Sequence, residues 1–286
     1  MSHPELLVVI NPARSEAIDA ARRTADWAAS VGWTVRLPAE DAALCDLPNT
    51  SWTDVPPAGD FALAVSLGGD GTMLRTVDLL GGAPVPILGV NIGQLGYLTE
   101  IEPPALEESL ARVVSGDFGI ERRMLLEVLV DTDGTDAERY LALNEAVLEK
   151  TSTGQTVRLD VDIDGRPFTP YETDGLIIAT PTGSTAYAFS VRGPIVAPTH
   201  RLVLLTPVSP HMLFDRTLVL EPDTELRLEV DGHRSAALSI DGRPRLVLDP
   251  GRVVRCRAAD EEVHLVTFVP RDFHNILKAK FGLADR

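Results

Sequence analysis

The chain has 286 residues, of which 44% are hydrophobic and 24% are charged, and its formal net charge is −16. This length and composition are typical of a globular protein of about two domains with a sizeable core. The negative field repels nucleic acid and anionic membranes, so neither is expected as a partner. It does not exclude a phosphate ligand, because backbone N–H groups and local cations can bind one inside an acidic protein.

Strands and helices are predicted to alternate over the first 120 residues. Short apolar runs predict strands at 6–10, 34–37, 61–67 and 85–90. Helical spacing of apolar residues predicts helices at 15–30, 73–80 and 104–114. The stretch 46–59 is rich in Pro, Asp, Ser and Thr and is predicted to be a loop. This alternation predicts an α/β domain over residues 1–120, with a parallel sheet and helices on both of its faces.

The pattern changes near residue 121, and from there to about residue 270 apolar and polar residues alternate with a period of two. Val157, Leu159, Val161 and Ile163 are one such series. Asp-Gly pairs fall between such runs and indicate hairpin turns; they lie at 164–165, 231–232 and 241–242. Residues 121–270 are therefore predicted to form an antiparallel β-sandwich domain, and residues 272–280 a final helix.

Two cysteines, Cys45 and Cys256, are compatible with either a disulfide or two reduced thiols. The N-terminus runs directly into a predicted strand and lacks the features of a secretory signal. No apolar run is long enough to span a bilayer. Reduced thiols and a cytoplasmic location are therefore predicted.

The segment Gly68-Gly69-Asp70-Gly71-Thr72 lies between a predicted buried strand and a predicted helix. Its glycines allow backbone N–H groups to approach a phosphate, which the N-terminus of the helix also favours. A carboxylate in such a loop repels phosphate, so Asp70 has a separate task if the loop is functional: accepting a hydroxyl proton or holding a metal ion. The alternative is an ordinary strand–turn–helix connection with Asp70 as an N-cap. The segment matches neither a Walker A motif nor Gly-x-Gly-x-x-Gly.

Two further polar segments follow or interrupt apolar strands. The segment 180–187 reads Thr-Pro-Thr-Gly-Ser-Thr-Ala-Tyr, and its hydroxyls and aromatic ring suit a polar ligand with a flat group. Asn144-Glu145 stands between two apolar runs, where each polar side chain needs a partner. A Ser/Thr-rich turn and hydrogen bonding within the fold are the alternatives.

The histidines show no metal-ligand spacing, and a partial calcium-loop pattern at 160–165 has Tyr171 where the loop needs a Glu. No metal-ligating residues are therefore assigned.

Together these segments resemble the NAD kinase family, in the family's order and over most of the chain. The motifs that carry the resemblance are Gly-Gly-Asp-Gly-Thr (68–72), Asn-x-Gly-x-Leu-Gly-Tyr (91–97), Asn-Glu (144–145), Asp-Gly-Leu-Ile with Thr-Pro-Thr-Gly-Ser-Thr-Ala-Tyr (174–187), Leu-Thr-Pro-x-x-Pro-His (205–211) and Asp-Gly (241–242). Gly-Gly-Asp-Gly-Thr alone is ambiguous, because lipid kinases and phosphofructokinases carry relatives of it. The joint set is specific.

The resemblance implies a kinase that transfers a phosphoryl group from ATP or polyphosphate to the 2′-hydroxyl of the adenosine ribose of NAD, with a divalent metal such as Mg²⁺. It also implies a homodimer or homotetramer, and a C-terminal segment, 271–286, that returns to the first domain as a helix. Asp70 would take the hydroxyl proton, and Gly68, Gly69, Gly71 and Thr72 would form the phosphate loop. The expected substrate-binding residues are Gly71, Leu74, Tyr97, Asn144, Glu145, Asp174, Thr182, Thr185, Ala186, Tyr187, Ser190 and Asp241.

The chain departs from the family pattern at Arg192. The family usually has Ser-x-Gly-Gly-Pro at 190–194, and here Arg replaces the first glycine. That position can require a positive φ or a close backbone approach, either of which Arg strains. Because Arg192 lies near the expected ligand contacts, a kinase of the same fold with another nucleotide, nucleoside or lipid acceptor is the first alternative. A non-catalytic nucleotide-binding module is the second.

Overall fold

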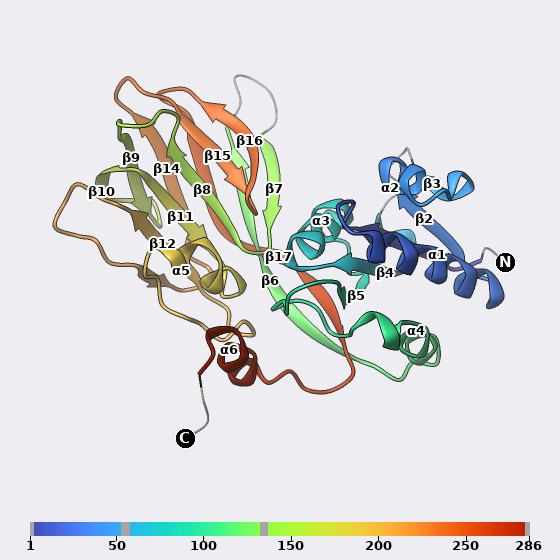
Figure 1. Cartoon of the computed structure of the whole chain (residues 1–286). Coiled ribbons are helices and arrows are strands. Elements are labelled where there is room, and N and C mark those ends of the chain that lie inside the picture. Colours follow the sequence, from blue (N-terminus) through green and yellow to red (C-terminus); the bar gives the residue numbers. More distant parts are fainter. Residues whose placement is uncertain (1–2, 53–57, 132–136, 284–286) are drawn as a thin grey trace. The chain divides into compact units, whose positions relative to one another are not determined.

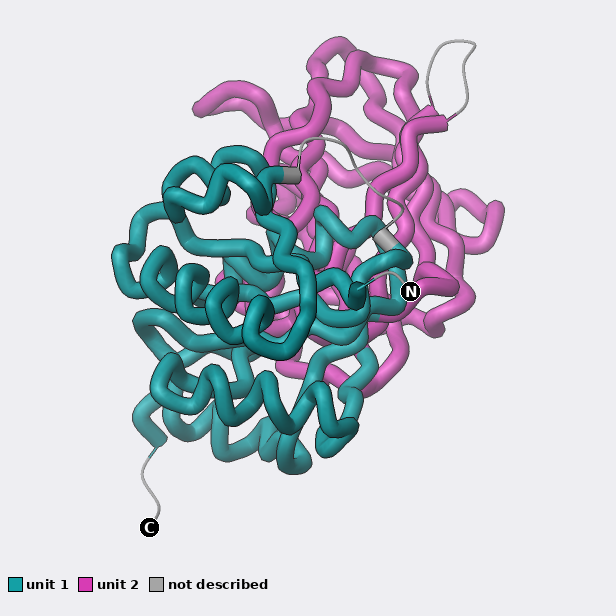
Figure 2. The backbone as a smooth tube through the Cα atoms, turned by 90° about the vertical axis from the view of Figure 1, so that its right-hand side faces the viewer, with its two compact units in different colours: residues 1–122, 263–286 teal, residues 123–262 magenta. Residues whose placement is uncertain are grey.

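The computed structural model describes residues 3–52, 58–131 and 137–283. The chain divides into two compact units (Figure 2). One comprises residues 1–122 together with 263–286, and the other comprises residues 123–262. Residues 53–57, part of the predicted loop, lie outside the described ranges.

The first unit contains a parallel sheet with the strand order β3-β2-β1-β4-β5 (Figure 1). Its strands are β1 (Glu5–Ile10), β2 (Thr34–Pro38), β3 (Ser51–Trp52), β4 (Phe61–Gly68) and β5 (Pro86–Asn91). The end of the long strand β17 (Val253–Thr267) pairs with β5 in parallel through His264 and Leu265. β1 and β4 are apolar almost throughout because both of their faces are buried.

Helices cover the sheet on both faces. α1 (Ser15–Ser30) and α4 (Leu106–Val114) share one core cluster with Leu6, Val8 and Ile10 of β1. Leu7 and Val9 point the other way and are also buried, on the face where α3 (Asp70–Leu80) packs against β1 and β4. The remaining helices of this unit are α2 (Ala39–Leu44), the 3₁₀ turns η1 (Pro48–Thr50), η2 (Ala58–Asp60) and η3 (Pro103–Ala105), and α6 (Phe273–Phe281).

The second unit is built from antiparallel strands in two sheets. One sheet has the order β13-β12-β11-β8-β15-β16, and the other contains β10-β9-β14-β17 together with the β6–β7 pair. The bounds are β6 (Gly119–Val130), β7 (Glu138–Ala142), β8 (Glu145–Lys150), β9 (Val157–Ile163), β10 (Arg166–Thr173), β11 (Gly175–Ala179), β12 (Val203–Val208), β13 (Leu218–Leu220), β14 (Leu226–Asp231), β15 (Ala236–Ile240) and β16 (Arg243–Leu248). A 3₁₀ turn, η4 (Thr182–Thr185), and a short helix, α5 (Tyr187–Ser190), follow β11.

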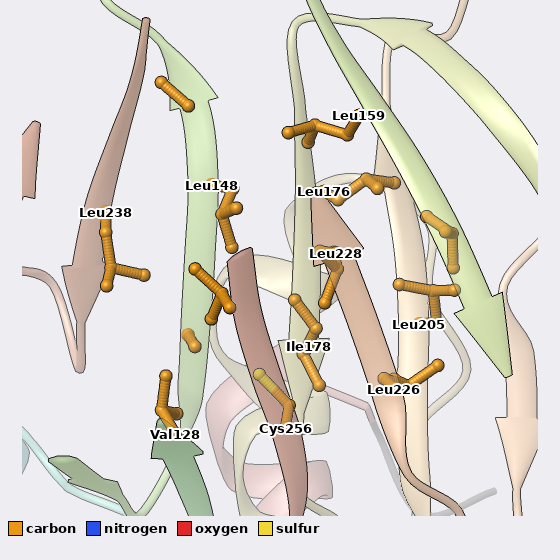
Figure 3. Packing of buried hydrophobic residues seen from close by; sticks show 14 of the residues in the cluster. Val128, Leu148, Leu159, Leu176, Ile178, Leu205, Leu226, Leu228, Leu238 and Cys256 are labelled. Carbon is orange, nitrogen blue, oxygen red and sulfur yellow. The ribbon is translucent and has the colours of Figure 1, made fainter. Parts of the chain in front are cut away.

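Side chains from both sheets form one apolar core in this unit. Figure 3 shows Leu148, Leu176 and Leu205 of the first sheet with Leu159 and Leu228 of the second. Each is buried, and burying such a side chain contributes roughly 1.5–3 kcal/mol. The alternating residues Val147, Ile177 and Leu204 face the other side of the first sheet and pack with Ala188 of α5. The predicted fold class, an α/β unit with an antiparallel β-sandwich, is confirmed.

Two of the three Asp-Gly hairpins are confirmed and one prediction is wrong. Asp164-Gly165 joins β9 to β10 and Asp241-Gly242 joins β15 to β16, and in both turns both residues have positive φ. At Asp231-Gly232 only the glycine does. This pair connects β14 of one sheet to β15 of the other, so it turns the chain between sheets. A two-residue type I′ hairpin needs positive φ at both positions.

Cys45 and Cys256 are both free and buried, as predicted. Burial raises the pKa of both thiols, which makes them unreactive. Among the described residues, none of the helices combines the length and apolarity needed to cross a bilayer.

Candidate active site

The Gly-Gly-Asp-Gly-Thr segment connects β4 to α3 in the first unit. β4 ends at Gly68 and α3 begins at Asp70. A Cβ on Gly68 would lie 2.2 Å from Oγ1 of Thr72, so only glycine fits there. Cβ atoms on Gly69 and Gly71 would meet nothing within 4 Å. These two glycines therefore leave backbone open at the N-terminus of a helix, where anions are favoured.

Backbone N–H groups hold the carboxylate of Asp70. Tyr97 donates its N–H to Oδ1 and Oδ2 at 2.9 and 3.0 Å, and Leu98 donates to Oδ1 at 3.0 Å. A Cβ on Gly96 would lie 2.4 Å from Oδ1, so this glycine makes room for the carboxylate. The two segments predicted separately, 68–72 and 91–97, are thus joined through Asp70.

Tyr97 and Leu74 lie in the same unit as Asp70. Both are partly buried. Burial, followed by the charge of Asp70, raises the pKa of the Tyr97 phenol, which therefore stays neutral. The Nζ of Lys280, from α6, lies 4.1 Å from the centre of the Tyr97 ring and 3.9 Å from Oδ2 of Asp70.

The sequence did not indicate two residues near the C-terminus of the chain, Arg271 and Lys280, that contact the segment around Tyr97. Arg271, which precedes α6, donates to the carbonyls of Tyr97 and Leu98 and to the carboxylate of Glu100. No local pattern marks Arg271 or Lys280, because their partners lie more than 170 positions earlier in the chain.

In the second unit Asn144 lies between β7 and β8 and Glu145 begins β8, and Asp241 holds the backbone of both. Oδ2 of Asp241 accepts the N–H of Leu143 at 2.8 Å. Oδ1 accepts the N–H groups of Asn144 and Glu145 at 2.7 and 3.1 Å. The N–H of Asp241 in turn donates to the carbonyl of Glu145. Asp241 thus binds the backbone of residues 143–145 with both carboxylate oxygens, and its expected contact with substrate stays a prediction.

The side chain of Glu145 is 5% exposed and its Oε2 has no hydrogen-bond partner. Burial and then the charge of Asp241 raise the pKa of Glu145 to about 8, against the opposing effect of a hydrogen bond from the Tyr187 backbone. A buried carboxyl with an unpaired oxygen needs a partner, and a ligand hydroxyl can supply it.

The Thr-Pro-Thr-Gly-Ser-Thr-Ala-Tyr segment packs directly on Asn144. The N–H of Thr180 donates to the Asn144 carbonyl at 2.9 Å, and the Thr180 hydroxyl donates to Leu143. A Cβ on Gly183 would lie 2.1 Å from the Asn144 carbonyl oxygen, so the segment needs glycine for this approach. Thr182 is buried and accepts a hydrogen bond from Arg123 at 3.2 Å. The segment 180–187 and the Asn144-Glu145 pair therefore form one cluster with Asp241.

The remaining expected residues divide into two groups. Thr185, Ala186, Tyr187 and Ser190 continue the cluster through η4 and α5, and Tyr187 and Ser190 are exposed. Asp174 precedes β11 and is ion-paired with Lys150 at 2.6 Å. Lys150 was not predicted from the sequence.

Within the described residues, no group of three or more His, Cys, Asp and Glu side chains could hold a metal ion. The Asp70 carboxylate is occupied by backbone N–H groups. The residues that the structure describes therefore form no metal cage of their own.

Family models and relatives match most of the chain. Residues 48–118 match the ATP-NAD kinase N-terminal domain and residues 143–268 match the ATP-NAD kinase C-terminal domain. An NAD kinase of Heliobacterium modesticaldum is 38% identical over 97% of this chain and 98% of its own length. An NAD kinase of Gemmatimonas aurantiaca is 42% identical over 76% of each chain.

Among solved structures, a yeast NADH kinase complexed with NADH superposes with a TM-score of 0.89. It is 25% identical, over 100% of this chain and 89% of its own. With both domain models matched in order, the chain belongs to the NAD kinase family.

Proposed function

We propose that the protein transfers the terminal phosphoryl group of ATP to the 2′-hydroxyl of the adenosine ribose of NAD, giving NADP and ADP. The match to both ATP-NAD kinase domains carries this proposal, and relatives at 38% and 42% identity support it. Polyphosphate is the alternative donor. NADH is an alternative acceptor, since the yeast relative is named an NADH kinase.

In this proposal Asp70 is the general base. The carboxylate accepts the 2′-hydroxyl proton while the ribose oxygen forms its bond to phosphorus and the bond to the departing ADP oxygen breaks. Phosphoryl transfer depends on alignment and charge stabilisation more than on covalent chemistry. The three N–H contacts to Asp70 fix the orientation of its oxygens before substrate arrives, as preorganised catalysis requires.

The open backbone of the phosphate loop, at Gly69 and Gly71, supports a role in approaching the donor phosphates. Leu74 and Tyr97 are proposed to bind adenosine. Asn144 and Glu145 are proposed to hold ribose and diphosphate oxygens, with Glu145 in its protonated form as a donor. The residues proposed for the adenine and nicotinamide side are Asp174, Thr182, Thr185, Ala186, Tyr187 and Ser190. Asp241 is proposed to act by holding the Asn144-Glu145 backbone.

A divalent metal, for which Mg²⁺ is our choice, is proposed to enter with the triphosphate and to neutralise its charge. Mg²⁺ is commonly held by substrate phosphates and water with few protein ligands, which fits a chain whose described residues offer no cage. We also propose a cytoplasmic homodimer or homotetramer. The free, buried thiols support a reducing compartment.

The test is a substrate panel with purified protein, Mg²⁺ and either ATP or polyphosphate, with the products identified by mass. The acceptors are NAD, NADH, adenosine and AMP. We expect NADP from NAD and ATP. A folded, metal-replete sample that phosphorylates another acceptor and leaves NAD unchanged rules the proposal out.

A further inference from the structure

The C-terminal segment of the chain binds the peptides that hold Asp70. Arg271 is 7% exposed along its side chain, as is its partner Glu100. Its Nε donates to Oε2 of Glu100 at 3.0 Å, and its Nη1 and Nη2 donate to the carbonyls of Tyr97 and Leu98, each at 3.1 Å. One buried guanidinium therefore binds three groups of the segment 97–100.

Tyr97 and Leu98 are thus held from two sides. Their N–H groups donate to the Asp70 carboxylate, and their carbonyls accept from Arg271. The other oxygen of Glu100 accepts the N–H of Phe268 at 2.7 Å and the hydroxyl of Thr267 at 3.1 Å. The ion pair consequently ties the end of β17 to the same segment, so the orientation of Asp70 depends on residues about 200 positions later in the chain.

We propose that Arg271 is a positioning residue for phosphoryl transfer, which sets the Asp70 carboxylate by fixing the Tyr97 and Leu98 peptides. This inference rests on the proposed role of Asp70 as the base. Without the guanidinium, the carbonyls of Tyr97 and Leu98 lose the donor that Arg271 supplies. The N–H of Glu100 still donates to the carbonyl of Gly89, so the expected change is a local shift of the Tyr97 and Leu98 peptides. A displacement of about 1 Å in a catalytic group can lower the rate roughly 100-fold.

The position of Lys280 supports the same conclusion independently. This residue lies nine positions after Arg271, and its ammonium lies 3.9 Å from Oδ2 of Asp70 and over the ring of Tyr97. The segment that carries Arg271 therefore also supplies a cation next to the proposed base.

The first experiment compares Arg271→Met and Arg271→Lys in the full chain, measuring kcat and the KM for NAD below the thermal midpoint of each variant. We expect Arg271→Met to lower kcat about 10- to 100-fold with little change in KM. Arg271→Lys keeps the charge but not the planar fork, so an intermediate kcat is expected. Arg36→Met is the matched control, because Arg36 also pairs with a carboxylate of this unit, Glu5, at 2.9 Å. An unchanged kcat in both Arg271 variants overturns the proposal.

The second experiment repeats the Arg271 substitutions in an Asp70→Asn background, with NADP quantified by enzymatic cycling. If Arg271 acts through Asp70, its substitution lowers kcat in the parent and has little further effect in the Asp70→Asn protein. Equal effects in both backgrounds contradict the inference and leave the proposed function standing. If the Asp70→Asn protein is itself fully active, Asp70 is not the general base, and the inference about Arg271 is wrong as well. If Arg271→Met fails to fold, Arg271→Lys is compared in the parent and Asp70→Asn backgrounds instead, with the same expected outcomes.

Discussion

The carboxylate of Asp241 accepts the backbone N–H of Asn144 at 2.7 Å, which joins two residues 97 positions apart. Asp241 occupies the first position of the turn between β15 and β16, with φ 49°. Its second oxygen binds the N–H of Leu143. The hairpin turn of one strand pair thereby fixes the residues that begin β8, and Glu145 receives its position and a neighbouring negative charge from the same side chain.

Asp241→Asn is expected to lower the free energy of unfolding by roughly 1.5–3 kcal/mol, since it removes a charged acceptor of three backbone N–H groups. Asp164→Asn is the control. Asp164 occupies the same position in the β9–β10 turn with φ 51°, and its carboxylate accepts one exposed N–H, from Glu225. Urea unfolding of both variants measures the difference. Equal losses would mean that the contacts to residues 143–145 contribute little.

The raised pKa of Glu145 predicts how the free energy of unfolding depends on pH. Burial and the charge of Asp241 raise its folded pKa to about 8, above the unfolded value of about 4.3. The stability that this group contributes is therefore complete below the unfolded pKa and is lost as pH rises toward 8. Each pKa unit corresponds to about 1.4 kcal/mol. We expect Glu145→Gln to remove this loss.

The measurement is the thermal midpoint of the parent and of Glu145→Gln at pH 6 and pH 8.5, without ligand. The parent is expected to lose stability across this interval, and the variant to lose less. Parallel pH profiles would show that Glu145 is ionised in the folded protein throughout this range.

The sequence predicted helices and strands well where the apolar residues of one face recur at a regular spacing. The alanines of α1 recur on one side, and its bounds, 15–30, agree with the prediction. α2 (Ala39–Leu44) was missed because six residues are too few to show a helical period. The start of α3 was placed at 73 instead of Asp70, because the first turn of that helix is occupied by the glycine-containing loop.

The site was predictable as motifs and not as contacts. The sequence contains Asp70 and the segment 91–97, but their hydrogen bonds depend on how β4 and β5 lie side by side. Arg271 and Lys280 gave no signal because their contacts span more than 170 residues. The positive φ of Arg192 was one of two possibilities that the sequence suggested, because the family has glycine at this position and glycine often marks a positive φ.

Asp70→Asn is expected to reduce kcat by roughly 10²- to 10⁴-fold, the usual contribution of a general base, with little change in the KM for NAD. Asn keeps the size of Asp and loses its basicity. Asp78→Asn is a suitable control because Asp78 is exposed on the same helix. A loss of less than tenfold in Asp70→Asn, with an unchanged thermal midpoint, would assign the proton transfer to another group.

Arg192→Gly is expected to stabilise the protein. Arg192 has φ 67°, a left-handed conformation at the end of α5, where its N–H donates to the carbonyl of Phe189 at 3.0 Å. A side chain in this conformation costs about 1 kcal/mol relative to glycine. Arg166→Gly is the control with the opposite sign, because Arg166 is exposed at the start of β10 and glycine weakens a strand. A lower thermal midpoint in Arg192→Gly would show that the left-handed conformation of Arg192 does not cost stability.

The same variant tests whether Arg192 selects the acceptor. If its guanidinium filled space needed by the nicotinamide half, or bound a phosphate that NAD lacks, removing it would raise kcat/KM for NAD relative to adenosine and AMP. A charged hydrogen bond contributes roughly 1.5–3 kcal/mol, which corresponds to a change of about tenfold or more in that ratio. The side chain is exposed, and the next residue, Gly193, makes the close approach in this turn, since its Cβ would lie 2.8 Å from the Ala188 carbonyl. We therefore expect an unchanged ratio. A tenfold rise for NAD would instead identify Arg192 as a determinant of acceptor choice.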